Sequence, residues 1–292
     1  MRWNPILRKG IIIDSRSSRL PVIIFFFNLI LSAAGIFNLA HLTMDARETA
    51  TIRYESIIQL YSLISTMEFM MLLVITPALT APAICSEREG QMLDLLQTTS
   101  LGNGRIVAGK LESAVIEMMA LLVSALPVQS LVFIFGGATA LDLLLPLIAF
   151  FAAILFIGGM GIFSSAICRR TVAANVVSYI LTVFMTGGTW LIAHFARWIS
   201  ARAADGEAVG TAGVWLYGLL FNPAVTYMCV IDRQAGDMTD ELTSLIGYVP
   251  KNPITEHWIP VSLLLQLIAA ACFIAGAVRI IAPGSGYFTG KD

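Results

Sequence analysis

Long apolar runs separated by short polar segments dominate this sequence. Six of the runs are long enough for a helix to cross a hydrocarbon core about 30 Å thick, which takes roughly 20 apolar residues. They cover residues 21–40, 60–84, 112–136, 142–167, 172–195 and 259–282. The pattern predicts one transmembrane domain over residues 1–292, an all-α integral membrane protein with six transmembrane helices.

The composition agrees with this prediction. Hydrophobic residues make up 57% of the chain and charged residues only 13%, whereas a soluble domain carries about 25% charged residues. The net charge of −1 gives no reason to expect a nucleic-acid partner. The four cysteines are far apart and form no CxxC or His/Cys cluster, so no metal or cofactor is expected on this chain.

Lysine and arginine predict the orientation of the spans. If the N-terminus is inside, the inner segments hold twelve of these residues and the short outer loops hold only Arg47 and Arg53. Such residues are concentrated in cytoplasmic loops. Both termini are therefore expected in the cytoplasm, in a multi-pass protein of the inner or plasma membrane.

The first 20 residues predict an interfacial helix. Apolar Trp3 and Ile6 alternate with basic Arg8, Lys9 and Arg16, a combination that suits contact with membrane lipids and anionic headgroups. The basic stretch is long and the apolar run continues beyond it, which disfavours a cleaved signal peptide.

The long segment 196–258 is expected to be an extracytoplasmic loop with an unusual centre. Residues 213–231 are apolar enough for a seventh span, but Asn222 and Pro223 interrupt them and break a helix there. Two short half-helices that enter the membrane and return explain both features. This re-entrant interpretation is favoured because a seventh span would move Arg279 and Lys291 outside.

The segment 86–105 joins the second and third spans and has the most informative pattern. Ser86 is expected to cap a helix that begins with acidic residues, and Gly102 and Gly104 are expected to end it. Its apolar face would consist of Met92, Leu93, Leu95 and Leu96. Physical reasoning alone leaves two interpretations open: a helix that docks into a soluble partner, or one that lies on the membrane surface.

A resemblance to a known family favours docking. The run from Glu87-Arg88-Glu89-Gly90 through the Leu-rich stretch to Thr98-Thr99, closed by Gly109-Lys110, resembles the membrane subunit of type-2 ABC transporters. Asn4-Pro5 and Asn222-Pro223 resemble two further positions of that family's pattern. The similarity covers the whole chain in hydropathy and about 30 residues in motif.

The resemblance implies a function and partners. Glu87, Arg88, Glu89 and the helix 90–99 would form a coupling helix that contacts a separate ATP-binding subunit. That subunit would bind ATP and Mg²⁺, so this chain would not itself be an enzyme. A second permease subunit, identical in a homodimer or related in a heterodimer, would complete the path of an exporter.

A nucleotide-binding motif in the same region is excluded. Residues 104–110 match the letters of a phosphate-binding loop, G-x-x-x-x-G-K. The next residue is Leu111, where that loop needs a Ser or Thr to hold Mg²⁺. An apolar span follows, so the sequence predicts that any ATPase is another chain.

Polar residues within the predicted spans are candidates for function or packing. Glu68 and Asn175 could line a substrate path, since intramembrane polar groups are expensive, or they could be hydrogen-bonded between helices. Gly161 and Ser165 form a pair of small residues that permits close helix packing inside the subunit or across a dimer.

Two other functions remain open at this point. An ion-coupled secondary transporter would need a buried ionisable site, and Glu68 is the candidate. A non-transporting membrane scaffold or sensor would bind a partner through residues 86–105 and move nothing.

Overall fold

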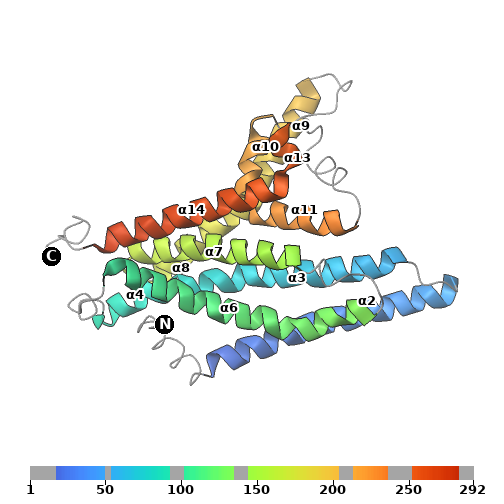
Figure 1. Cartoon of the computed structure of the whole chain (residues 1–292), viewed down its shortest axis with the longest axis horizontal. Helices are drawn as coiled ribbons and strands as arrows, with labels where there is room; N and C mark the ends of the chain where they lie inside the picture. The colour runs from blue at the N-terminus through green and yellow to red at the C-terminus, as the bar shows by residue number, and fades with distance from the viewer. Residues whose placement is uncertain are drawn as a thin grey trace.

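The computed structural model describes residues 18–49, 54–92, 102–134, 144–203, 213–235 and 252–282, and these residues are overwhelmingly helical (Figure 1). The predicted interfacial helix over residues 1–20 lies almost entirely outside them. The long helices are α2 (Arg19–Thr49), α3 (Tyr54–Thr80), α6 (Asn103–Ile134), α7 (Leu144–Ile167), α8 (Thr171–Val183), α9 (Thr189–Ala203) and α14 (Trp258–Ile281). The shorter elements are α4 (Pro82–Glu89), η1 (Phe184–Gly188), α10 (Trp215–Gly218), η2 (Leu219–Phe221), α11 (Pro223–Ala235) and α13 (Pro253–Glu256).

Among the described residues, six helical stretches are long and apolar enough to cross a membrane, which agrees with the predicted number. They are Arg19–His41, Leu60–Glu89, Asn103–Ser130, Leu144–Ile167, Thr171–Arg202 and Trp258–Ile281. The start of α2, the end of α14 and helix α4 lie at the same end of the bundle (Figure 1). We call this the terminal end.

Several helices extend beyond the predicted spans, and one predicted helix end was wrong. The third helix begins at Asn103, so Gly104 lies in its first turn instead of ending the preceding helix. Helix α2 continues to Thr49 beyond the predicted residue 40, and α9 continues to Ala203 beyond residue 195. Polar residues flanking an apolar run can remain helical outside a hydrocarbon layer, so hydropathy marks where a span leaves the membrane and not where its helix ends.

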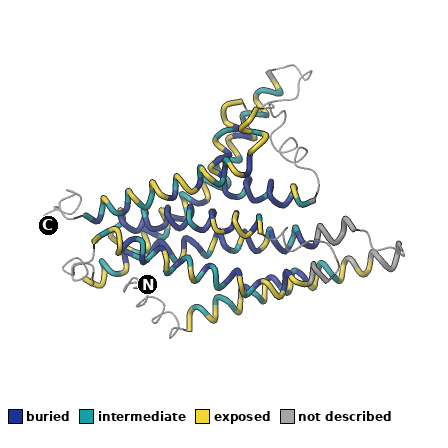
Figure 2. Tube along the Cα trace, in the orientation of Figure 1, coloured by how far each residue is buried: buried dark blue, intermediate teal, exposed yellow. Residues whose placement is uncertain are grey.

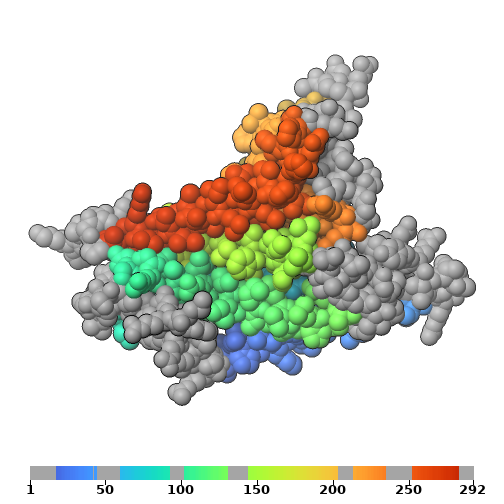
Figure 3. Space-filling view, viewed as in Figure 1, coloured from blue at the N-terminus to red at the C-terminus, as the bar shows by residue number. Residues whose placement is uncertain are grey.

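Helix α7 lies at the centre of the bundle. Sixteen of its 24 residues are buried, whereas most residues of α2 and of α8–α9 are not, and the buried tube in Figure 2 runs along α7. Gly159 allows α14 to approach, since a Cβ there would meet the Ala270 carbonyl oxygen at 3.3 Å. Small residues let helix backbones approach closely, which is how helices associate within lipid. On the face shown in Figure 3, α14 lies along the upper part of the bundle, and parts of α7 and α6 are visible below it.

The apolar segment 213–231 folds into short elements on either side of Asn222. The backbone of Asn222 is extended, with φ −87° and ψ 110°, and α11 begins directly after it at Pro223. Helix α11 packs against α3, α7 and α14. Its Tyr227 ring stacks on Phe69 of α3, with centroids 4.3 Å apart. The break predicted at Asn222 and Pro223 is therefore present, and the helix after it belongs to the buried core.

The fifth span contains a local change in helical winding. Residues Phe184–Gly188 form a π-helical turn between α8 and α9. Single π-helical turns of this kind are rare inside α-helices. The Thr186 carbonyl in this turn accepts a hydrogen bond from the Asn222 side chain, so the turn contacts the segment that follows α9 in the chain.

Candidate functional site

Helix α4 is a short continuation of the second span beyond a break in the backbone ladder. Pro82 occupies its first turn and has no N–H to donate to the residue four positions earlier. The free N–H groups of Ile84 and Cys85 instead donate to the Ser165 hydroxyl of α7, each at 3.0 Å. A side chain of a neighbouring helix therefore satisfies the start of α4.

Gly161 makes this arrangement possible from one turn away on α7. A Cβ at Gly161 would lie 1.9 Å from Thr80 Oγ1 and 2.8 Å from Thr80 Cβ, at the end of α3. Gly161 and Ser165 lie on the same face of α7 because they are four residues apart. The structure places this pair inside the subunit, against the junction of α3 and α4.

The acidic–basic–acidic triplet occupies the last turn of α4. The expected Ser86 cap was wrong, because the helix begins upstream at Pro82 and Ser86 lies within it. A serine followed by acidic residues looks the same in the sequence whether it begins a helix or lies inside one. At the surface of the bundle, Glu87 pairs with Lys110 of α6, with 2.6 Å between Oε1 and Nζ.

Arg88 closes the end of α7. Its two terminal nitrogens donate to the carbonyls of Cys168, at 2.7 Å, and Ala166, at 3.1 Å. The last carbonyls of a helix have no intrahelical partner and carry the negative end of its dipole. The Arg88 guanidinium therefore supplies two hydrogen-bond donors to these carbonyls and a positive charge at the negative end of the dipole.

Glu89 binds the N-terminal end of the next helix, α8, as Arg88 binds the C-terminal end of α7. Its carboxylate accepts from the backbone N–H and the hydroxyl of Thr171, both at 3.0 Å, at the first residue of α8. An anion at a helix N-terminus is favoured by the free N–H groups and the positive end of the dipole. The order of charges in the triplet thus matches the ends of α7 and α8, which are separated by the short turn 168–170.

We call α4 and its contacts through Ser165, Glu87, Arg88 and Glu89 the α4 joint. It connects the end of the second span to α6, α7 and α8 at the terminal end of the bundle. Beyond it the chain turns sharply at Gln91, whose φ is +54°. Met92 follows, and its side chain is exposed.

The remaining predicted coupling residues lie outside the described residues: these are Leu93, Leu95 and Leu96. Their packing and the course of the helix 93–99 are therefore not placed, and the docking role of the segment stays a prediction. The side chains of Glu87, Arg88 and Glu89 are used for contacts within the chain. The first exposed apolar residue of the predicted docking face is Met92.

Residues 104–110, which match the letters of a phosphate-binding loop, form the first turns of α6. A phosphate-binding loop needs a non-helical backbone whose N–H groups point at the phosphates. Within the described part of the chain, no cluster of three or more His, Cys, Asp or Glu is placed to hold a metal ion.

The two predicted substrate-path residues lie in different surroundings and are not brought together. Glu68 is buried in α3 and accepts a hydrogen bond from Gln129 of α6. Asn175 is half-buried on α8, and its amide oxygen has no partner among the described residues.

A second set of polar contacts surrounds the Asn222 break. The Asn222 carboxamide oxygen accepts from the N–H groups of Ala224 and Val225, so it caps α11. Its nitrogen donates to the Thr186 carbonyl, at 2.6 Å, and to the Thr189 hydroxyl, at 2.9 Å. One side chain thereby connects the start of α11 to the π-helical turn.

The set continues on α14 through neutral side chains. Gln266 donates to the Thr226 hydroxyl at 2.8 Å, and Ser262 donates to the Leu220 carbonyl at 2.6 Å. Thr226 and Ser262 are themselves hydrogen-bonded. We call these contacts of Asn222, Thr226, Ser262 and Gln266 the Asn222 joint.

Sequence reasoning found some of these residues and missed others. It singled out Asn222 and the triplet but not Gln266, Ser262 or Thr171. Ser262 and Gln266 are four residues apart on an otherwise apolar span, and this spacing of polar residues was the available signal. Nothing local connects Thr171 to Glu89, which is 82 residues earlier.

The fold defines a multi-pass α-helical membrane protein. No protein-family model matches the chain, and no curated protein matches its sequence.

Proposed function

We propose that the chain is the transmembrane permease subunit of an ATP-driven ABC transporter, acting as an exporter. ATP hydrolysis would occur on a separate subunit, and a second permease subunit would face this one across the substrate path. The observation that carries the proposal is the α4 joint, in which consecutive charges connect one short helix to three spans.

The joint has the mechanical properties that coupling needs. A force on α4 reaches α3 directly through the chain, α6 through Glu87, α7 through Arg88, and α8 through Glu89. Charge-assisted hydrogen bonds are shorter and stronger than neutral ones. A displacement of α4 would therefore move several spans together instead of bending α4 alone.

The proposal assigns different roles to the triplet and to the residues after it. The triplet holds α4 to the spans, while Met92 and the apolar positions Leu93, Leu95 and Leu96 contact the ATP-binding subunit. The terminal end then faces the cytoplasm with both termini, in agreement with the distribution of Lys and Arg. Helix α11, packed among three spans, supports a re-entrant segment over 213–231.

Purification from native membranes tests the proposal directly. We expect a soluble ATPase to copurify in stoichiometric amount with the wild-type chain. Met92→Asp places a charge on the proposed docking face, and losing one buried apolar contact there should reduce recovery of the ATPase about tenfold or more. Leu95→Asp should act in the same direction.

Met44→Asp is the matched control. Met44 is exposed like Met92 but lies near the opposite end of α2 from the terminal end. It should leave recovery of the ATPase unchanged. Absence of an ATPase, or equal losses in Met92→Asp and Met44→Asp, would contradict the proposal.

An ion-coupled carrier is the second candidate, because Glu68 is buried in a span and one of its oxygens has no partner among the described residues. Transport that continues after ATP depletion but stops when the proton gradient collapses would favour this candidate.

A further inference from the structure

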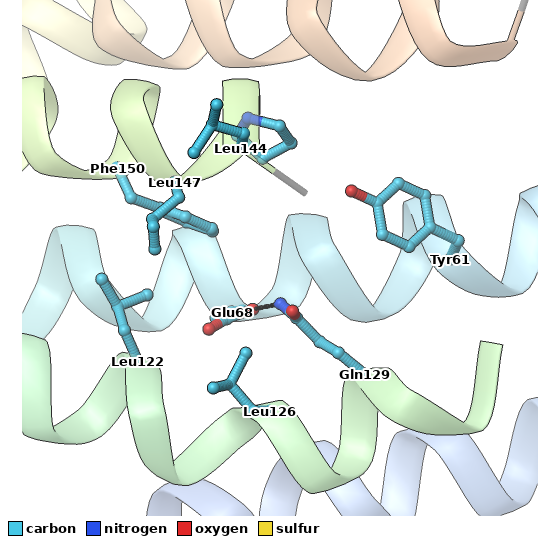
Figure 4. A pocket seen from close by; sticks show the side chains of 9 residues that line it. Tyr61, Glu68, Leu122, Leu126, Gln129, Leu144, Leu147 and Phe150 are labelled. Atoms are coloured by element: carbon cyan, nitrogen blue, oxygen red, sulfur yellow. Dashed lines mark hydrogen bonds between the residues drawn. The ribbon is translucent and has the colours of Figure 1, made fainter. Parts of the chain in front are cut away.

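A pocket of about 210 Å³ lies between α3, α6 and α7. Its walls are apolar side chains of α6 and α7: Leu122, Leu126, Leu144, Pro146, Leu147 and Phe150. Figure 4 shows the labelled side chains of these two helices on opposite sides, with Glu68 of α3 between them. The pocket therefore has hydrocarbon walls and a carboxyl group inside it.

The polar groups of the pocket have unused hydrogen-bonding capacity. Glu68 is 1% exposed, and Gln129 donates to one of its oxygens. The other oxygen, Oε1, has no hydrogen-bond partner among the described residues. A buried acceptor without a donor is costly, and a buried carboxylate without a positive partner costs more. An amine that takes up the proton of this buried carboxyl group becomes a cationic donor beside an ionised acceptor, which satisfies Oε1 and balances the charge.

The walls distinguish between possible cationic partners. A hard metal cation such as Ca²⁺ takes about six to eight oxygen ligands, whereas the described residues of the lining include three polar side chains, those of Tyr61, Glu68 and Gln129. The leucine, proline and phenylalanine side chains require a hydrocarbon partner instead. An amine attached to an apolar body satisfies both the carboxyl group and the walls.

The position of the pocket indicates the route of access. Glu68 is eight residues into the span Leu60–Glu89, which places it about 12 Å along the helix from the start of that span. Leu126, Leu144 and Leu147 line the pocket and are also exposed, so the pocket is open to its surroundings at these residues. A ligand dissolved in the membrane can enter between these residues.

We propose that this pocket binds an apolar amine from the membrane, with its N–H donors on Glu68 and its hydrocarbon body against Leu126 and Leu147. The ligand carries no phosphate, because a phosphate beside a buried carboxyl group would be repelled. The proposal goes beyond the coupling function and does not depend on it, since the pocket is separate from the α4 joint.

Photolabelling of the full chain in phosphatidylcholine nanodiscs tests the proposal. This lipid has no N–H donor that would compete for Glu68. The probe is decylamine carrying a diazirine, and mass spectrometry identifies the labelled peptides. We expect saturable labelling at residues 122–129 and 144–150, displaced by unlabelled decylamine but not by decanol. Equal displacement by decanol, which has the same chain but no amine, would overturn the proposal. This comparison uses the wild-type protein alone.

Two variants locate the amine. Glu68→Gln retains the shape of the side chain but removes its charge, and should weaken decylamine binding about tenfold to a hundredfold. Glu112→Gln makes the same change at an exposed carboxyl of α6 and should have no effect. Unchanged labelling in Glu68→Gln would contradict the assignment. Displacement by added phosphatidylethanolamine would overturn the exclusion of phosphate-bearing amines.

Discussion

The α4 joint and the Asn222 joint both attach a short helix to longer ones, the first with charged side chains and the second with neutral ones. Each secures a short helix, next to a break in the backbone, to several long helices. The α4 joint uses a carboxylate, a guanidinium and a second carboxylate, all partly exposed at the end of the bundle. The Asn222 joint uses only amides and hydroxyls, and Asn222, Thr226, Ser262 and Gln266 are all buried.

The difference follows from access to water. Charges retain part of their hydration at the end of a bundle, whereas burying them costs several kcal/mol per ion. Neutral polar side chains lose less hydration free energy when they are buried, and they can hydrogen-bond to one another. This explains the mutual hydrogen bonds of Thr226, Ser262 and Gln266. Loss of a group should therefore cost more in the buried joint than in the partly hydrated one.

Buried cysteines of this protein allow its unfolding to be followed in every variant. Cys85 and Cys229 are buried in the folded protein. A thiol-reactive dye added during heating or denaturant titration therefore reports unfolding in detergent, after correction for the more accessible Cys168 and Cys272.

The largest effect is expected from Gly161→Ala. The new Cβ would overlap Thr80, so α7 must move away from α3 and carry Ser165 away from α4. Overpacking of this kind should cost about 3 kcal/mol. Gly104→Ala is the control, because nothing lies within 4 Å of a Cβ there. Similar unfolding midpoints for the two variants would show that the close approach at Gly161 is not needed.

Asn222→Ala should have the next largest effect. It removes the cap of α11 and leaves the Thr186 carbonyl without its donor, which together should cost about 2–3 kcal/mol. Asn175→Ala, where the amide oxygen has no partner among the described residues, should be nearly neutral. If both alanine variants unfold at the wild-type midpoint, the Asn222 joint contributes nothing to stability.

Arg88→Ala should destabilise the protein by about 2 kcal/mol, because two carbonyls at the end of α7 lose a charged donor. Arg88→Lys should recover only part of this loss, since an ammonium cannot reproduce the forked geometry. Arg169→Ala removes a neighbouring exposed arginine and serves as the control. Full recovery by lysine would contradict the importance of the fork.

The smallest effect is expected from Glu87→Gln. Its pair with Lys110 is partly exposed, so its loss should cost no more than about 1 kcal/mol. The difference from wild type should shrink in 1 M salt, where the screening length is about 3 Å. Asn222→Ala provides the contrast, because the cost of losing a buried neutral contact should not change with salt. A difference for Glu87→Gln that persists at high salt would show that the pair acts through packing.

The two joints also show where local reasoning succeeds and where it ends. Asn222-Pro223 was recognisable as a break, because proline and its preceding residue disfavour helix in any context. Ser86 before three charged residues looked like a helix start, although the helix begins at Pro82. The pattern of a cap does not reveal whether a helix already precedes it, and a partner such as Ser165 is invisible to local reasoning.

The sequence by itself determined the class of protein and the six membrane-spanning stretches that its described residues contain. A bilayer requires about 20 apolar residues per span, and a helix satisfies its own backbone hydrogen bonds without distant partners. Only the tertiary structure decided which helix ends the charged side chains of the triplet contact and which side chains meet at Asn222. It also decided that Glu68 lies in a pocket with Gln129. These contacts join residues that are far apart in the chain, such as Glu68 and Gln129, 61 positions apart. Their formation depends on how the helices pack, and the apolar pattern of each helix leaves that choice open.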